Sequence, residues 1–236
     1  MNLRKQIKDS DKPLFKVIRI LYRIIFNFSI PAPRSIWYPI WQLVNFVRNL
    51  YYWAISVFWI TPIYKGLSKK IGENFTAETF LPYVIGKGHI FAGDNVSIHG
   101  KVDFIFGSIK RETPEIHIGD NTGIGHNVMF DIAGKLVIGN NCLIASDVSF
   151  QDCSGHSIDA EKRIKKIPPD EKEVKPITIG NNVWIGTGAY IFPGTKIGDN
   201  CVISAMTPVG RKIPPNHLVY ATPSKIVKIR SISKML

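Results

Sequence analysis

An isoleucine, usually followed by glycine, recurs every six residues in the second half of the chain, and this period constrains the fold more than any other feature. In each repeat a small or β-branched residue follows four positions after the isoleucine. An α-helix cannot produce a period of six, whereas a parallel β-helix does, because each hexapeptide supplies one short strand and one turn. We therefore predict triangular coils of about 18 residues whose apolar anchors stack into one buried column. The anchors are Ile118, Ile124, Ile138, Ile144, Ile179, Ile185, Ile191, Ile197 and Ile203.

The repeat divides the chain into three predicted regions. A β-helix is expected over residues 81–210, preceded by a helical region, 1–80, and followed by a C-terminal extension, 211–236. The hexapeptide period is interrupted at residues 151–176, which we predict to leave the β-helix as a long polar loop. Long loops on a rigid scaffold often carry function, so we expect the active site there.

Basic charge is concentrated at the N-terminus. The chain has a formal net charge of +12, and residues 1–70 hold twelve Lys/Arg against two Asp, a net +10. Between Lys12 and Phe28 four cations recur at helical spacing beside apolar residues, which predicts an amphipathic helix. Residues 36–64 form a second apolar segment, rich in Trp and Tyr, whose one charge is Arg48.

These two segments have three alternative interpretations. The basic and aromatic composition favours helices that lie in a membrane surface and contact anionic headgroups through residues 1–70. The same helices would alternatively pack on the β-helix or on neighbouring subunits. A membrane span is the third interpretation, but the charge-free run from Asn49 to Tyr64 has 16 residues and carries a polar stripe. A span requires about 20 apolar residues.

Cysteine usage indicates a reducing compartment. Cys142 and Cys201 occupy the small interior position of the repeat, and Cys153 lies in the predicted loop. An odd, unpatterned set of cysteines argues against a disulfide framework and against a metal cluster. We expect a cytoplasmic protein at the inner face of the cytoplasmic membrane.

Three stretches of the chain carry a more specific signal than the repeat itself. They read DCSGHSID at residues 152–159, KPITIGNNVWIG at 175–186 and IFPGTKIGDN at 191–200. With them, about residues 81–230 resemble the hexapeptide-repeat acyltransferases. The nearest subgroup is similar to the maltose, galactoside and Nod-factor O-acetyltransferases and to their relatives acting on capsule, colanic-acid and lipopolysaccharide sugars.

The resemblance implies a mainly β fold, a left-handed parallel β-helix, with three chains per molecule. It also implies acetyl-CoA as acyl donor, active sites between neighbouring subunits, and direct transfer in a ternary complex. His156 matches the catalytic histidine of the family and would be the general base. Independently, a sugar hydroxyl that attacks a thioester must lose its proton, and imidazole titrates near neutral pH. Asp152 would orient the His156 imidazole.

Other roles follow from the same resemblance. Asn127 and Asp131 would contact the acceptor, although an asparagine at a β-helix corner also has a plain turn interpretation, and Asp131 one as a solvated loop acid. The residues expected to bind the coenzyme are Trp184, Gly186, Thr187, Ala205, Arg211 and Lys225. Two turns on the coenzyme side depart from the family pattern: residues 204–207 read SAMT instead of Gly-Ala-Gly-Ser, and 221–224 read ATPS instead of Gly-x-Pro-Ala. The acyl group is therefore open between acetyl and a longer chain.

Two other classes of protein share features with this chain. The γ-type carbonic anhydrases have the same solenoid and bind zinc through three histidines. Here only His99 and His117 are spaced to lie one coil apart on the same face, so we expect no metal site. A nucleic-acid binder would combine its basic charge with a recognisable reading module, and the sequence contains none, so we expect no nucleic-acid partner.

The sequence thus predicts an acetyl-CoA-dependent O-acetyltransferase. Its acceptor would be a hydroxyl of a sugar in a bacterial surface polysaccharide or in the lipid-linked precursor, and its assembly a homotrimer. An N-acetyltransferase acting on an amino sugar and a non-catalytic β-helix scaffold are the alternatives.

Overall fold

A computed structural model describes residues 12–109 and 112–221, and the chain separates into two compact units between Asn49 and Leu50. The first unit contains α2 (Pro13–Asn27) and the beginning of α3 (Arg34–Ile55). These helices match the two predicted segments, and the break between them contains Pro31 and Pro33, which cannot continue a helix. Within the described residues, no helix is both long and apolar enough to cross a membrane.

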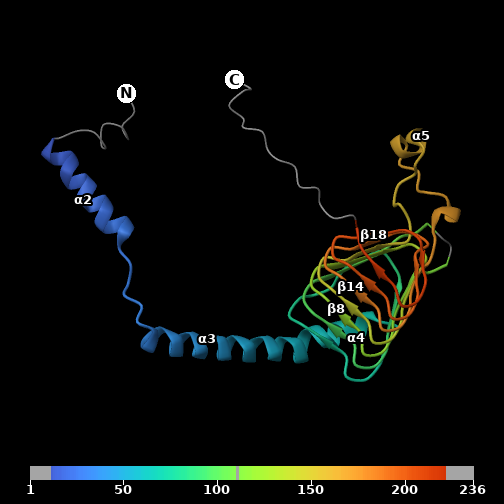
Figure 1. Ribbon diagram of the computed structural model, residues 1–236, viewed down its shortest axis with the longest axis horizontal. Coiled ribbons are helices and arrows are strands. Elements are labelled where there is room, and N and C mark those ends of the chain that lie inside the picture. The colour runs from blue at the N-terminus through green and yellow to red at the C-terminus, as the bar shows by residue number, and fades with distance from the viewer. Residues whose placement is uncertain (1–11, 110–111, 222–236) are drawn as a thin grey trace. The chain divides into compact units, whose positions relative to one another are not determined.

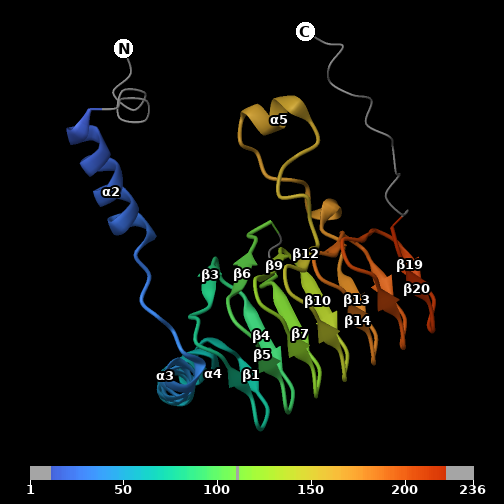
Figure 2. The same cartoon turned by 60° about the vertical axis from the view of Figure 1, so that its left-hand side comes forward.

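The second unit is a parallel β-helix of three sheets, whose successive coils stack side by side (Figures 1 and 2). Sheet A consists of β1 (Lys70–Ile71), β4 (His89–Ala92), β7 (Glu115–Ile118), β10 (Lys135–Ile138), β13 (Ile177–Ile179), β16 (Lys196–Ile197) and β19 (Lys212–Ile213). Sheet B consists of β2 (Thr76–Ala77), β5 (Ser97–Ile98), β8 (Gly123–Ile124), β11 (Leu143–Ile144), β14 (Trp184–Ile185), β17 (Val202–Ile203) and β20 (Leu218–Val219). Sheet C consists of β3 (Tyr83–Ile85), β6 (Val102–Phe106), β9 (Val128–Ile132), β12 (Ser149–Gln151), β15 (Tyr190–Ile191) and β18 (Pro208–Val209).

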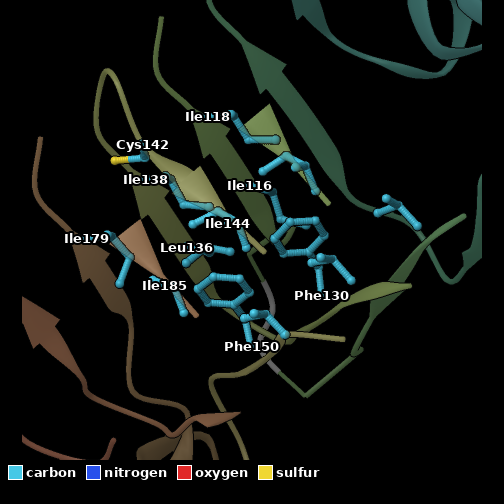
Figure 3. Close-up of a cluster of buried hydrophobic side chains, with 14 of the residues drawn as sticks. Ile116, Ile118, Phe130, Leu136, Ile138, Cys142, Ile144, Phe150, Ile179 and Ile185 are labelled. Atoms are coloured by element: carbon cyan, nitrogen blue, oxygen red, sulfur yellow. The ribbon is translucent and has the colours of Figure 1, made fainter. Parts of the chain in front are cut away.

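The predicted fold class is confirmed. In sheet A the anchors Ile118, Ile138 and Ile179 lie in register on neighbouring strands, and all are buried. In sheet C the rings of Phe130 and Phe150 stack with centroids 5.3 Å apart (Figure 3). Each coil therefore buries its apolar positions against the coils above and below, as the period of six requires.

The β-helix begins one coil earlier than the repeat predicts, at β1, and continues to β20. The early coil is hard to recognise because Phe75 occupies the position that small residues fill elsewhere. Here the larger ring fits because Tyr64 covers the open end of the solenoid, with its ring centroid 5.9 Å from that of Phe75. Tyr64 belongs to α4 (Thr61–Leu67), which follows the π-helix η1 (Ser56–Ile60). The predicted boundary at residue 80 therefore lies inside the second unit.

Coil length varies along the solenoid. Between β4 and β7, and between β5 and β8, equivalent positions are 26 residues apart, compared with 18 between β13 and β16. The longer coil shifts His117 onto sheet A, whereas His99 directly follows β5 of sheet B. The prediction that these two histidines share one face is therefore wrong.

The predicted loop leaves the β-helix between β12 and β13. It contains the short helix α5 (Ala160–Ile164) and one 3₁₀ turn, η2 (Glu171–Glu173). α5 stands away from the coils in both views (Figures 1 and 2). The two ends of the loop meet at the solenoid, where Lys175 N donates to Asp152 O at 2.8 Å.

Candidate active site

His156 lies in the first turn of the loop, and its side chain is exposed. The backbone around it is held: Ser154 Oγ donates to the His156 carbonyl at 2.8 Å, and Arg163 Nη1 donates to the Ser157 carbonyl at 3.0 Å. Gly155 has φ +71°, a left-handed conformation that glycine adopts without steric cost. Among the described residues the imidazole has no hydrogen-bond partner, so a ligand can reach it from outside the coil.

Asp152 is fully buried at the end of β12 and accepts hydrogen bonds from three backbone N–H groups of the preceding coil. Oδ1 accepts from Ala133 N at 2.7 Å, and Oδ2 accepts from Gly134 N at 2.7 Å and from Lys135 N at 3.1 Å. Burial raises the pKa of Asp152 to about 6, although the three donors favour the ionised form. This position differs from the expected one, because the described contacts join the carboxylate to the turn between β9 and β10 and not to His156.

The two predicted acceptor residues lie at opposite ends of β9. Asn127 precedes the strand at the corner between sheets B and C, in a left-handed conformation, and its Nδ2 donates to Asp147 Oδ1 at 2.7 Å. Asp131 lies near the other end, half-buried, and accepts from Gln151 Nε2 at 3.2 Å. Burial raises the pKa of Asp131, and the Gln151 amide opposes the rise. At about 3.3 Å per residue, the two side chains lie on the order of 13 Å apart along the strand.

Four of the predicted coenzyme residues lie together on sheet B and at its corner with sheet C. Trp184 is exposed on β14, and Gly186 and Thr187 follow this strand. Ala205 lies one coil further, where a Cβ at Gly186 would meet Ala205 N at 2.6 Å. Met206 occupies the next position with φ +56° and is 73% exposed, so a bulky side chain stands where the family pattern has glycine.

The remaining two coenzyme residues do not join this group. Arg211 lies at the corner between sheets C and A, immediately before β19, and is exposed. Lys225 lies outside the described residues. The structure thus brings His156, Asp131 and Asp152 together at one edge of sheet C, and places Asn127 with the sheet B group at the other edge.

The histidines of the early coils pair with carboxylates on separate sheets. His99 Nδ1 lies 3.0 Å from Glu78 Oε1, and His117 Nε2 lies 2.9 Å from Glu115 Oε2. The bond from His117 and a contact with Lys135 lower the pKa of Glu115. Across residues 12–109 and 112–221, no three His, Cys, Asp or Glu side chains are placed to hold one metal ion.

Sequence reasoning missed two polar residues of the sheet C edge. Gln151 and Tyr190 are outward-facing, half-buried residues that are hydrogen-bonded to each other, Tyr190 Oη to Gln151 Oε1 at 2.6 Å. Their signal is weak in the sequence, because outward positions of a β-helix follow no apolar pattern. The one indication in the sequence is that Gln151, a polar residue, lies one coil after Asp131.

Comparison with known proteins agrees with the fold and its repeat. The bacterial transferase hexapeptide (six repeats) family matches residues 176–209. The lipopolysaccharide biosynthesis protein WbbJ of Escherichia coli K12, named as an O-acetyl transferase, is 31% identical over 68% of this chain and 71% of its own length. The galactoside O-acetyltransferase of Escherichia coli K12 is 38% identical over 58% of this chain and 62% of its own length.

The chain spans 55% and 62% of the lengths of the first two curated relatives, so the match covers only part of each of these proteins. Among solved structures, the polysialic acid O-acetyltransferase OatWY matches with a TM-score of 0.50 and 26% identity, covering 67% of this chain and 72% of that one. The repeat, the three-sheet solenoid and these matches converge on one conclusion: the chain belongs to the family of hexapeptide-repeat transferases.

Proposed function

We propose that this protein is an acetyl-CoA-dependent O-acetyltransferase whose acceptor is a sugar hydroxyl of a surface polysaccharide or of its lipid-linked precursor. The observation that carries the proposal is the exposed His156 on a held turn, in a chain of the hexapeptide-repeat transferase family. The turn lies against the Gln151 amide, which donates to Asp131. The names of the galactoside, lipopolysaccharide and polysialic acid relatives support a sugar acceptor and an O-acetyl product.

In the proposed reaction His156 takes the proton of the acceptor hydroxyl as its oxygen attacks the thioester carbonyl carbon. The new C–O bond forms, the C–S bond breaks, and the thiolate of coenzyme A leaves with the proton returned from the imidazolium. Atoms and charges balance without a metal or an enzyme-bound ester. A base with a pKa near the working pH suits this step, because it must be neutral before the attack and charged after it.

We further propose a homotrimer with the site between chains. The turn with His156 lies at one edge of sheet C, and the group from Trp184 to Ala205 lies at the other, at the corner with sheet B. Acetyl-CoA bound at that corner would therefore lie far from His156 of the same chain. A neighbouring chain that brings its sheet B corner to the His156 edge would complete the site. Symmetric assembly would then give three equivalent sites.

The test of the function is release of free thiol from acetyl-CoA that depends on an added sugar. We expect release with methyl β-galactoside or maltose above the rate with water alone, and a product whose acetyl group is removed by mild alkali or hydroxylamine, as an ester is. An alkali-resistant product formed from glucosamine would identify the N-acetyltransferase alternative. Absence of coenzyme binding in calorimetry would favour the scaffold and contradict the proposal.

Membrane contact through the N-terminal region is a separate proposal. Lys12 precedes α2, and Lys16, Arg19 and Arg23 follow on it at helical spacing. Apolar side chains of the same helix are exposed, Leu21 at 50% and Ile25 at 66%. A basic, amphipathic helix with exposed apolar residues binds anionic lipid surfaces by burying that face among the headgroups. This contact would place the protein at the inner face of the cytoplasmic membrane.

We expect the full-length protein to sediment with vesicles of phosphatidylglycerol and phosphatidylethanolamine, and the double variant Leu21→Glu, Ile25→Glu to lose this binding about 100-fold. The estimate takes roughly 1.5 kcal/mol for each buried aliphatic side chain. Leu218→Glu, at an exposed leucine of β20, adds charge elsewhere and is the matched control. A double variant that sediments like the wild type would exclude α2 as the contact.

A further inference from the structure

Three hydrogen-bonded side chains cross the outer face of sheet C beside the His156 turn. Asp131 and Gln151 are register partners on β9 and β12, and Tyr190 reaches Gln151 from the next strand, β15. Tyr190 Oη lies 2.6 Å from Gln151 Oε1, and Gln151 Nε2 lies 3.2 Å from Asp131 Oδ2. We call these three residues the sheet C row.

The orientation of the central amide is determined by its neighbours. An ionised carboxylate only accepts hydrogen bonds, so Gln151 turns its NH₂ group toward Asp131. Its carbonyl oxygen then faces Tyr190, whose hydroxyl donates to it. A flip of the Gln151 amide would break both hydrogen bonds, and each is worth about 1 kcal/mol or more. The row therefore presents two fixed groups, the second amide N–H of Gln151 and the remaining lone pairs of Asp131.

The sheet C row lies directly beside the turn that carries His156. A Cβ at Gly155 would lie 3.8 Å from Gln151 Nε2, so the residue before His156 sits next to the amide. All three side chains of the row are only half-buried. A ligand that contacts them would lie beside the turn that carries His156.

An aromatic surface adjoins these polar groups. Phe192 is 40% exposed, and its ring centroid lies 4.7 Å from that of Tyr190. A sugar ring carries hydroxyls on its edge and C–H groups on its faces, so it matches fixed polar groups next to an aromatic ring. A phosphate or another anion would instead be repelled by Asp131.

We infer that Gln151 and Tyr190 of the sheet C row complete the acceptor subsite expected at Asp131. Gln151 donates to a sugar oxygen next to the hydroxyl from which Asp131 accepts. Tyr190 is a positioning residue that acts through Gln151. The inference rests on the proposed function, because it places the acceptor beside the proposed base. It adds two specificity-determining residues, Gln151 and Tyr190, to the site.

The experiment compares Tyr190→Phe and Gln151→Glu with wild type in the full-length protein, using methyl β-galactoside and maltose as probes. Tyr190→Phe keeps the ring and removes only the donor, so we expect the KM for the sugar to rise about 5-fold, the equivalent of one neutral hydrogen bond. Gln151→Glu places a second carboxylate against Asp131, and we expect a rise of more than about 10-fold. The KM for acetyl-CoA and the kcat at saturating sugar should stay within about twofold of wild type.

Tyr83→Phe, an exposed tyrosine of β3 in the same sheet, is the matched control and should change neither KM. Sugar binding is followed separately by saturation transfer from protein to sugar protons. Binding that requires the row, without any acetyl transfer, would support the subsite and contradict the proposed function. Unchanged sugar KM values in both variants, a lower melting temperature as their only effect, or wild-type protein that binds neither sugar would each overturn the subsite.

Discussion

Replacement of His156 by alanine is expected to lower the turnover number by about 10²- to 10⁴-fold, the usual contribution of a general base. The imidazole is exposed and makes no hydrogen bond within the described residues, so its removal should leave the fold and the affinity for acetyl-CoA unchanged. Turnover is measured by sugar-dependent thiol release, and coenzyme binding by calorimetry. His217→Ala removes an exposed histidine of the last coil and is the control for the effect of losing a surface histidine elsewhere. Near-normal turnover of His156→Ala would remove this residue from the mechanism.

Mixed assemblies test whether the site lies between chains. Ala205→Trp should block the donor corner, whereas His156→Ala removes the base, and each variant alone should be inactive. If one chain supplies the base and its neighbour the donor corner, random mixing restores about a quarter of the sites. Mixtures without activity would show that one chain contains the whole site.

Replacement of Asp152 by alanine is expected to have the largest effect on stability, a loss of roughly 3 kcal/mol or more in the free energy of unfolding. The substitution leaves three backbone N–H groups without an acceptor, and each buried, unsatisfied donor costs about 1–3 kcal/mol. Asp152→Asn should not restore stability, because an amide directs an NH₂ group at donors. Chemical denaturation with and without acetyl-CoA measures the loss.

Asp159→Ala provides a comparison within the same loop. Asp159 accepts from Glu161 N at 2.8 Å as the N-cap of α5, and loss of an exposed cap costs about 1 kcal/mol. If both aspartate variants lose the same stability, the three bonds of Asp152 do not anchor the loop.

Asp152 also predicts a pH dependence of stability. Its pKa in the folded chain is raised to about 6, above the ordinary value of 3.8, so the folded state binds this proton more tightly than the unfolded state. The resulting stabilisation is complete below pH 4 and is lost as the pH rises through 6. Asp131, whose pKa is also raised by burial, changes the stability with pH in the same direction, and it is present in both wild type and Asp152→Ala. The decrease in melting temperature between pH 4 and 7 should therefore be smaller in Asp152→Ala than in wild type, and equal decreases would contradict the assignment.

The sequence predicted the features that depend on a regular period. Ile138 and its equivalents identified the coils, the gap at 151–176 identified the loop, and the cation spacing identified α2. The first coil was missed because Phe75 breaks the small-residue pattern, and only the packing of Tyr64 over the open end explains how that ring fits. The prediction that His99 and His117 share one face was wrong because the coils differ in length, which shifts residues from one sheet to another.

The site was less predictable than the fold for a related reason. An aspartate two residues after a buried strand residue has the same sequence signal whether it points inward to backbone donors, as Asp152 does after Phe150, or outward to a ligand. Likewise, the bond between Gln151 and Tyr190 joins residues 39 positions apart, and it depends on a diagonal reach across two strands. Such contacts require coordinates, since no local pattern encodes them.

The capped first coil has a consequence for the architecture of the second unit. Each coil contacts only the coils next to it, and each adds about 4.8 Å along the solenoid axis. His156 follows the fourth coil, so its distance along the axis from Tyr64, which covers the open end, is set by a whole number of coils. Gain or loss of one complete coil between Tyr64 and His156 would move His156 by one fixed step along the axis and preserve its immediate surroundings.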